Sequence, residues 1–486
     1  MLDEIQETGA EKLRKPFYLL ILVFFALACS VAIAKQGFAI GLVLIILPFL
    51  LYSVVRIFLD PRFGLFLVFG FSFFAIGISR YVTANIPFGL AVDAILVLLL
   101  IALILGRGRH LQWKMASNDF TVISILWLGY TFLEIANPEA VSFAAWFYAM
   151  RGVALYQILM VVGGFLILKD KKDLKLFLMI WFALSLFAAL KGFQQIQIGP
   201  DKWENAWLDA GGAITHRIQG KLRAFSIYSD AGQFGAAMGH VALVAAIIGI
   251  GPGPKRRKWI LFSIAAFTTM GMLLSGTRGA FFVPVAGAML YLFLSRNFKV
   301  FIVGMIFAVG VYGFLKYTTV GNTNYQIFRL RTAVNPSGDR SFQVRLENQQ
   351  KLKVYLSNKP LGGGIGSSGN WGMRFSPNTF LAQTPTDSWY VKIWAEMGII
   401  GLILHLLILF YLLFRCCNIV WKLKDPELRQ IMLGLTAGIF GIMAASYGNG
   451  VYGQMPTGMV IYLSYVFIFI SPSIEKSLPL RPSLSK

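Results

Sequence analysis

The chain has 486 residues, of which 57% are hydrophobic and 14% are charged. A typical soluble domain has about 25% charged and 45–50% apolar residues, so this composition excludes a soluble globular protein. The net charge of +22 could indicate nucleic-acid binding, but most basic residues lie in short loops, where they set membrane topology and contact lipid head groups. We therefore expect a lipid bilayer around the protein and no nucleic-acid partner.

Apolar runs long enough to cross a hydrocarbon core of about 30 Å recur from Phe17 almost to the C-terminus. They predict an all-α, polytopic integral membrane protein in which residues 1–486 form a single membrane domain. The first run should be a retained signal anchor, because no small-residue cleavage pattern ends it. We expect about fourteen spans, near residues 17–34, 38–55, 63–79, 88–106, 119–136, 152–168, 174–193, 233–250, 259–275, 279–295, 299–315, 389–414, 430–447 and 456–472.

The orientation follows from the lysines and arginines in the loops. Basic clusters such as 107–114, 169–175 and 255–258 alternate with loops that carry single cations such as Arg80 and Arg278. If the N-terminus is cytoplasmic, every cluster falls inside, so both termini are predicted to be cytoplasmic. Two longer segments, 194–232 and 316–388, then face outside.

The first outer loop, residues 194–232, carries a compact group of ionisable side chains. It ends shortly before the predicted span at 233–250, so these groups should lie at the mouth of that span. The candidate residues are His216, Arg217, Lys221, Arg223 and Asp230.

A tight hairpin, residues 275–278, separates the predicted spans 259–275 and 279–295 and contains Arg278. An arginine held between two apolar helices is costly beside hydrocarbon, which makes it a functional hypothesis. The alternative is an interfacial arginine that extends to the lipid head groups. The sequence alone favours neither interpretation.

The large outer loop, residues 316–388, has three parts. An amphipathic helix is predicted at 339–356, carrying Arg345 and lying on the membrane surface. The glycine run 362–366 follows, in which Gly363 and Gly364 could form an anion-binding nest or a tight turn. The loop ends at Asp387 and Ser388, where a span begins.

These outer residues suit phosphate chemistry. Arginine makes paired hydrogen bonds to phosphate oxygens and stays charged at any working pH. We expect a diphosphate to be held by Arg217, Arg223, Arg278 and Arg345. Asp387 could accept a proton from an attacking hydroxyl, or it could be the N-cap of the following helix. Ser388, His216, Lys221 and Asp230 are possible supporting residues.

Neither a metal site nor a cofactor site is predicted. The three cysteines lie in or at the inner ends of spans, and the four histidines have no metal-ligand spacing. The acidic residues form no cluster of the kind that binds divalent cations.

Several motifs resemble the O-antigen ligase and Wzy-type polymerase superfamily of bacterial membrane glycosyltransferases. The family has an arginine hairpin of the Ser-x-Ser-Arg-Gly kind, here residues 275–279, and a Pro-Leu-Gly-x-Gly element, here 360–364. It also has a histidine, then Asn, Ser or Gln, nine residues, and Gly-x-x-Gly; here Asp387 replaces the histidine and the glycines are Gly398 and Gly401. Residues 223–226 with Asp230 resemble a further family segment.

The resemblance implies a fold of the GT-C type in the bacterial inner membrane, with the active face outside. It implies metal-independent transfer of a glycan from undecaprenyl diphosphate to an acceptor hydroxyl on a glycan or a lipid. Asp387 and Arg278 would be catalytic. An O-antigen or polysaccharide polymerase is the first interpretation and an O-antigen ligase is the second. A lipid-linked oligosaccharide flippase is an alternative from a different class.

Overall fold

The computed structural model describes residues 38–81, 88–106, 111–218, 220–296, 298–321 and 340–478, together with a few isolated positions. The described chain is almost entirely helical, with one two-stranded antiparallel hairpin. The prediction of an all-α protein is confirmed.

The chain forms two compact units, Met1–Gly64 and Leu65–Lys486. The smaller unit contains α3 (Phe38–Leu59) and the start of α4 (Pro61–Ser72). A single membrane domain over residues 1–486 stays a prediction.

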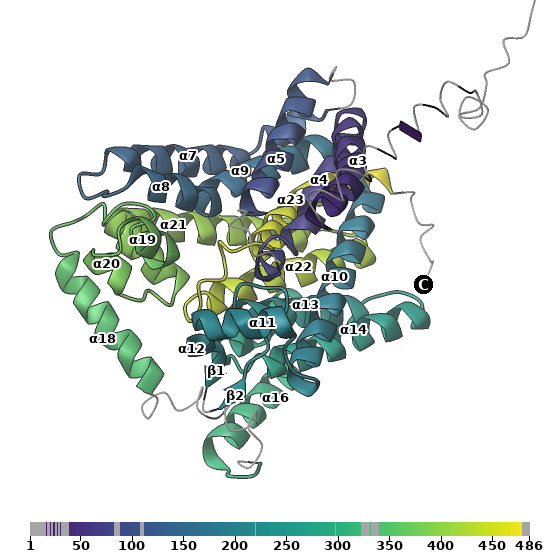
Figure 1. The fold of residues 1–486 in the computed structure, drawn as a ribbon. Helices are drawn as coiled ribbons and strands as arrows, with labels where there is room; N and C mark the ends of the chain where they lie inside the picture. The colour runs from purple at the N-terminus through teal and green to yellow at the C-terminus, as the bar shows by residue number, and fades with distance from the viewer. Residues whose placement is uncertain are drawn as a thin grey trace, which may run out of the picture. The chain divides into compact units, whose positions relative to one another are not determined.

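The larger unit contains the remaining helices and strands (Figure 1). In chain order these are η1 (Gly77–Arg80), α5 (Phe88–Leu105), α6 (Trp113–Ala116), α7 (Asp119–Leu133), η2 (Glu134–Ala136), α8 (Phe143–Met150), η3 (Arg151–Leu155), α9 (Tyr156–Ile167), α10 (Lys171–Gln197), α11 (Lys202–Trp207), η4 (Leu208–Gly212), α12 (Ala213–His216), β1 (Arg217–Ile218), β2 (Lys221–Leu222), α13 (Ala231–Ile250), α14 (Lys255–Leu274), η5 (Arg278–Phe281), α15 (Phe282–Leu294), α16 (Phe298–Tyr317), α18 (Arg340–Tyr355), α19 (Gly369–Phe375), α20 (Phe380–Gln383), α21 (Trp389–Lys422), α22 (Pro426–Ala445) and α23 (Thr457–Ser477).

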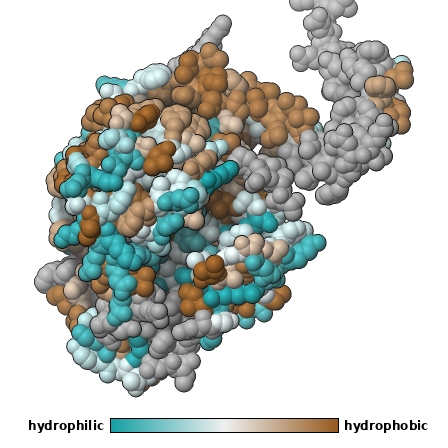
Figure 2. Space-filling model, turned by 60° about the vertical axis from the view of Figure 1, so that its left-hand side comes forward, coloured by the Kyte–Doolittle hydropathy of each residue, from teal (hydrophilic) through white to brown (hydrophobic). Residues whose placement is uncertain are grey.

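Eight helices in the described part of the chain are long and apolar enough to cross a membrane. They are α5, α7 with η2, α8 continued through η3 into α9, α10, α13, α21, α22 and α23. This supports an all-α membrane protein. The predicted count of fourteen spans and the GT-C-type fold are not confirmed, and the first predicted span, 17–34, lies largely outside the described residues. Figure 2 shows both hydrophobic and hydrophilic surface on one face of the molecule.

The most buried spans are α13, α23, α22 and the span formed by α8, η3 and α9. Helix α13 packs against α14, α15 and α22, and α22 packs against α23. Small residues allow close approach of such helices; a Cβ atom on Gly239 of α13 would lie 2.9 Å from the sulfur of Met272 on α14. This packing brings the N-terminus of α13 against η5.

Helix α18 confirms the helix predicted at 339–356, although Asp339 itself lies outside the described residues. On its last turn Leu352, together with the following Leu356, is buried against Leu381 and Ala395, whereas Val354 is exposed. Figure 1 shows α18 at the edge of the unit, leading to α19 and α20.

Candidate active site

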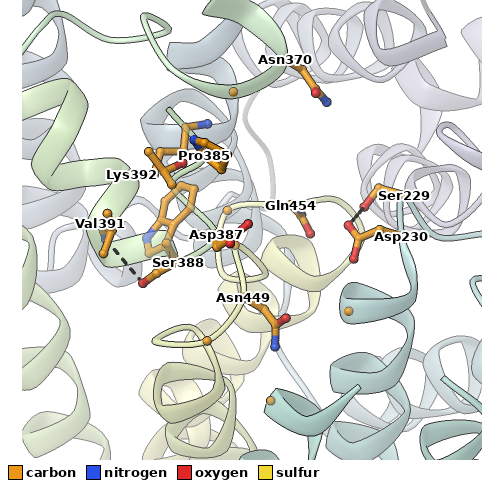
Figure 3. Close-up of a pocket in the computed structure, with 18 of the residues that line it drawn as sticks. Ser229, Asp230, Asn370, Pro385, Asp387, Ser388, Val391, Lys392, Asn449 and Gln454 are labelled. Atoms are coloured by element: carbon orange, nitrogen blue, oxygen red, sulfur yellow. Dashed lines mark hydrogen bonds between the residues drawn. The ribbon is translucent and has the colours of Figure 1, made fainter. Parts of the chain in front are cut away.

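A cavity of about 1010 Å³ collects most of the predicted site residues. Its lining comes from α8 and η3, the 215–223 segment, the start of α13, η5, α18, α19, the start of α21, and the connection between α22 and α23. Figure 3 shows part of this lining, with Asp387 and Gln454 on either side of an open space. The cavity is lined by His216, Arg223, Asp230, Arg278, Arg345, Asp387 and Ser388.

Asp387 stands immediately before α21 but does not cap it. The Ser388 hydroxyl accepts a hydrogen bond from the Val391 amide at 3.4 Å and donates one to the Ser446 carbonyl at 3.2 Å. The alternative role of Asp387 as N-cap is therefore wrong. Its side chain is 49% exposed, and its Oδ2 lies 3.5 Å from Nε of Arg345. Asp387 also has a φ of 33°, a left-handed backbone conformation that aspartate tolerates better than most residues.

Arg278 is half-buried at the first position of η5 and lines the cavity. The hairpin before it is held by Arg223, whose guanidinium donates to the Ser275 carbonyl at 3.1 Å and to the Thr277 hydroxyl at 2.6 Å. A third bond, of 3.1 Å, reaches the Thr215 carbonyl. Arg223 therefore uses at least three of its five N–H groups on the protein, which favours a role in positioning Arg278.

Asp230 caps α13, because its Oδ1 accepts a hydrogen bond from the Gln233 amide at 2.9 Å. Its other oxygen accepts a 2.7 Å bond from the Ser229 hydroxyl, which is drawn in Figure 3. This carboxylate is therefore oriented by the protein at the edge of the cavity.

His216 is buried against the rings of Trp207 and Phe225, whose centroids each lie 5.0 Å from its own. Burial lowers the pKa of His216, and the hydrogen bond to the Gly212 carbonyl only partly opposes this. Since that 2.9 Å bond requires a proton on Nδ1, Nε2 of the neutral ring is an acceptor.

Four predicted site residues do not line the cavity. Arg217 is exposed and donates to Asn205 Oδ1 at 3.3 Å, and Lys221 is exposed on β2, where it pairs with Ile218. Gly363 donates its amide to the Ala395 carbonyl at 2.9 Å. A Cβ atom on Gly364 would lie 2.7 Å from Cα of Ala140.

The glycine run is therefore a packing element. It fits against a bend in α21 at Gly398, whose φ of 63° and ψ of −167° are non-helical. A Cβ atom on Gly398 would lie 2.5 Å from the Gly362 amide nitrogen and would overlap the Pro360 carbonyl. Tight packing, rather than an anion-binding nest, accounts for these glycines.

The connection between α22 and α23 also lines the cavity, although no residue of it was predicted as part of the site. The Trp389 amide donates to the Ser446 carbonyl at 3.0 Å and to the Asn449 carbonyl at 3.3 Å. The Asn449 side chain lies between Gly232 of α13 and Gly279 of η5. Asn449 is therefore close to the N-terminal ends of α13, η5 and α21. The sequence feature that could have indicated this connection is the polar, glycine-rich run 446–456 between two apolar spans.

Two further sets of lining residues were also missed. Tyr148, Arg151 and Tyr156 come from the α8–α9 region, and Asn370 and Trp371 come from α19. In the described part of the chain, no group of three or more His, Cys, Asp or Glu side chains could hold a metal ion.

Comparison with known proteins agrees with the motif pattern. Residues 261–406 match the family model described as "O-Antigen ligase", a range that contains Arg278, Arg345 and Asp387. A protein named O-antigen polymerase from Salmonella muenchen is 30% identical over 198 residues, which is 40% of this chain and 48% of that protein. The chain thus spans about half the length of this curated relative. These similarities confirm the resemblance of this chain to the superfamily of O-antigen ligases and O-antigen polymerases.

Proposed function

We propose that this protein is a polysaccharide polymerase that transfers a glycan from undecaprenyl diphosphate to an acceptor hydroxyl at the outer leaflet. The proposal is carried by one observation: the Asp387 carboxylate lines the same cavity as Arg278 and lies 3.5 Å from Arg345. A proton acceptor and two arginines in one cavity meet the needs of a transfer with an anionic leaving group.

In the proposed reaction, the acceptor hydroxyl oxygen attacks the anomeric carbon of the donor sugar and its proton passes to Asp387. The bond between the anomeric carbon and the diphosphate oxygen breaks, and the electron pair leaves with the diphosphate. Arg278 and Arg345 would hold that developing charge through hydrogen bonds. The chain's own cations would do this without a metal ion.

The pair between Arg345 and Asp387 is compatible with this exchange. Both side chains are more than one-third exposed, at 40% and 49%. Exposed ion pairs contribute at most about 1 kcal/mol. Arg345 can therefore leave Asp387 and bind a substrate phosphate at little cost, which frees the carboxylate for the acceptor.

An O-antigen ligase is the second candidate, because the family model that matches residues 261–406 carries that description. Polymerase and ligase share the donor and differ in the acceptor, which is a growing glycan for one and a lipid-linked core for the other.

The test is transfer by purified protein reconstituted with undecaprenyl-diphosphate repeat units, followed by product length on a gel. Asp387→Asn keeps the side-chain shape but removes the proton acceptor, so the rate should fall by about 10²–10⁴-fold. Arg278→Ala should reduce it by about 10²–10³-fold. Longer glycan supports a polymerase, and product that requires an added lipid-linked core supports a ligase.

Arg217→Ala is the matched control, because it removes another arginine of the 194–232 segment that does not line the cavity. It should retain wild-type activity within about twofold. If wild-type protein forms no product but moves the lipid-linked glycan across vesicles, the enzyme proposal is wrong and a flippase is favoured.

We further propose that the cavity faces the periplasm, with both termini in the cytoplasm of a bacterial cell. Asn378 lies on the exposed part of the 316–388 segment. A cysteine introduced there should react with a membrane-impermeant maleimide added to intact spheroplasts. Labelling only after the cells are opened would reverse the orientation.

A further inference from the structure

The cavity lining contains an aromatic region that the proposed reaction does not use. Ligand pockets are commonly about 300–1,000 Å³, so a cavity of about 1010 Å³ has room for more than one diphosphate. Besides the arginines and carboxylates, its lining includes Tyr148 and Trp371, with Asn370 beside them.

Tyr148 and Trp371 are stacked, with ring centroids 4.9 Å apart and planes 19° from parallel. Phe375 stacks on the same tyrosine at 5.5 Å and 16°. Trp371 and Phe375 are only 6.3 Å apart, so both lie on one side of Tyr148. Phe375 does not line the cavity, whereas the partly exposed Trp371 does.

Tyr148, the ring on which the other two stack, lies against a buried group of charged and polar side chains. The Arg151 guanidinium lies 4.9 Å from the centre of the Tyr148 ring. Arg151 forms an ion pair with Asp93, which also accepts a 2.6 Å hydrogen bond from the Tyr156 hydroxyl. Because α8 also packs against α19, the helix that carries Trp371 is held against the helix that carries Tyr148.

We propose that Trp371, supported by Tyr148 and flanked by Asn370, is a subsite for a pyranose ring of the glycan substrate. The aliphatic C–H face of a pyranose packs on an aromatic face, and its hydroxyls both donate to and accept from a side-chain amide. Figure 3 shows the Asn370 amide extending from its helix at the margin of the cavity. The sugar could come from the donor or from the acceptor. This subsite rests on the proposed glycan transfer.

The first experiment measures sugar binding without any reaction. Purified protein in nanodiscs is titrated with the methyl glycosides of glucose, galactose, mannose, rhamnose and N-acetylglucosamine, and saturation-transfer NMR reports binding. Trp371→Ala should weaken the binding of at least one glycoside about tenfold, which corresponds to about 1.4 kcal/mol. Trp371→Tyr should restore most of the binding because it restores a ring.

Phe375→Ala is the matched control, because it removes a ring from the same stack without removing cavity lining. It should bind glycosides like the wild type. The proposal is overturned if wild-type protein binds none of the glycosides, if Trp371→Ala binds them equally well, or if Phe375→Ala loses as much binding as Trp371→Ala.

The second experiment assigns the source of the sugar. In the transfer assay, Trp371→Ala should raise the KM for one substrate about tenfold with a smaller change in kcat. A rise in donor KM assigns the subsite to the donor glycan, and a rise in acceptor KM assigns it to the acceptor. If transfer occurs and neither KM changes, the subsite is refuted while the proposed function stands. If wild-type protein transfers nothing, the proposed function fails and glycoside binding alone decides the subsite.

Discussion

Helix α21 bends at Gly398, and Gly398→Ala tests whether this bend holds the glycine run in place. The φ of 63° and ψ of −167° lie in a region that is almost restricted to glycine, where another residue costs about 1–3 kcal/mol. The added Cβ atom would also overlap the Pro360 carbonyl and lie 2.5 Å from the Gly362 nitrogen. Overpacking adds about 1–3 kcal/mol, so the total loss should be about 2–6 kcal/mol.

Gly369→Ala separates the two contributions. Gly369 has a φ of 60°, close to that of Gly398, but no atom lies within 4 Å of an added Cβ. This variant should therefore lose only the conformational term, about 1–3 kcal/mol. Both variants are heated in detergent at one fixed rate, because thermal unfolding of large proteins is often irreversible. The temperature at which the monodisperse peak in size-exclusion chromatography falls by half is the readout.

Gly398→Ala should lose that peak several degrees below Gly369→Ala. If the two variants melt at the same temperature, close packing between residues 360–362 and the bend does not stabilise the fold, and the reasoning is refuted.

Three further predictions concern the lining of the cavity. Ser388→Ala should lower the free energy of unfolding by about 1 kcal/mol, because it removes the N-cap of α21. Asp387→Asn should have the melting temperature of the wild type. If both variants lose the same stability, Ser388 is not the residue that caps α21. Arg223→Ala should cost at least about 2 kcal/mol, since it removes three hydrogen bonds from a charged group, while exposed Arg217→Ala should change stability by no more than about 0.5 kcal/mol; a stable Arg223→Ala protein would contradict the positioning role. Burial lowers the pKa of His216 in the folded protein. Below the usual histidine pKa of about 6.5, the unfolded state therefore binds a proton that the folded state does not. The free energy of unfolding should then decrease as the pH is lowered. Melting temperatures between pH 7.5 and 5 should show this decline, and His216→Gln should show a shallower one; an unchanged slope would rule out a contribution from His216.

The helical membrane architecture was predictable because apolar runs report burial in lipid directly. The arginine hairpin at 275–278 and Asp387 were also proposed as site residues from the sequence. Each belongs to a short motif whose residue spacing can be read directly along the chain. The structure places Arg278, Arg345 and Asp387 in one cavity.

Contacts between distant segments could not be read from local spacing. Arg217 and Arg223 are six positions apart and looked equivalent, but only Arg223 turns toward the hairpin of residues 275–277. For the glycine run, the sequence left an anion-binding nest and a tight turn as alternatives, because the bend in α21 that the run packs against is visible only in three dimensions. Asn449 was overlooked for the same reason, since its neighbours Gly232 and Gly279 lie far away in the sequence.

The left-handed backbone at residue 387 restricts which amino acids can supply the proposed proton acceptor at this position. Asn, Asp and His are the non-glycine residues most enriched at positive φ, and with φ at 33° this position accepts all three. Aspartate and histidine are also the two members of that set that can take up a proton. The main chain therefore permits an exchange between the family's histidine and the aspartate found here. Asp387→His should fold and shift the pH profile of transfer toward the imidazole pKa, whereas Asp387→Glu, although chemically closer, should lose stability.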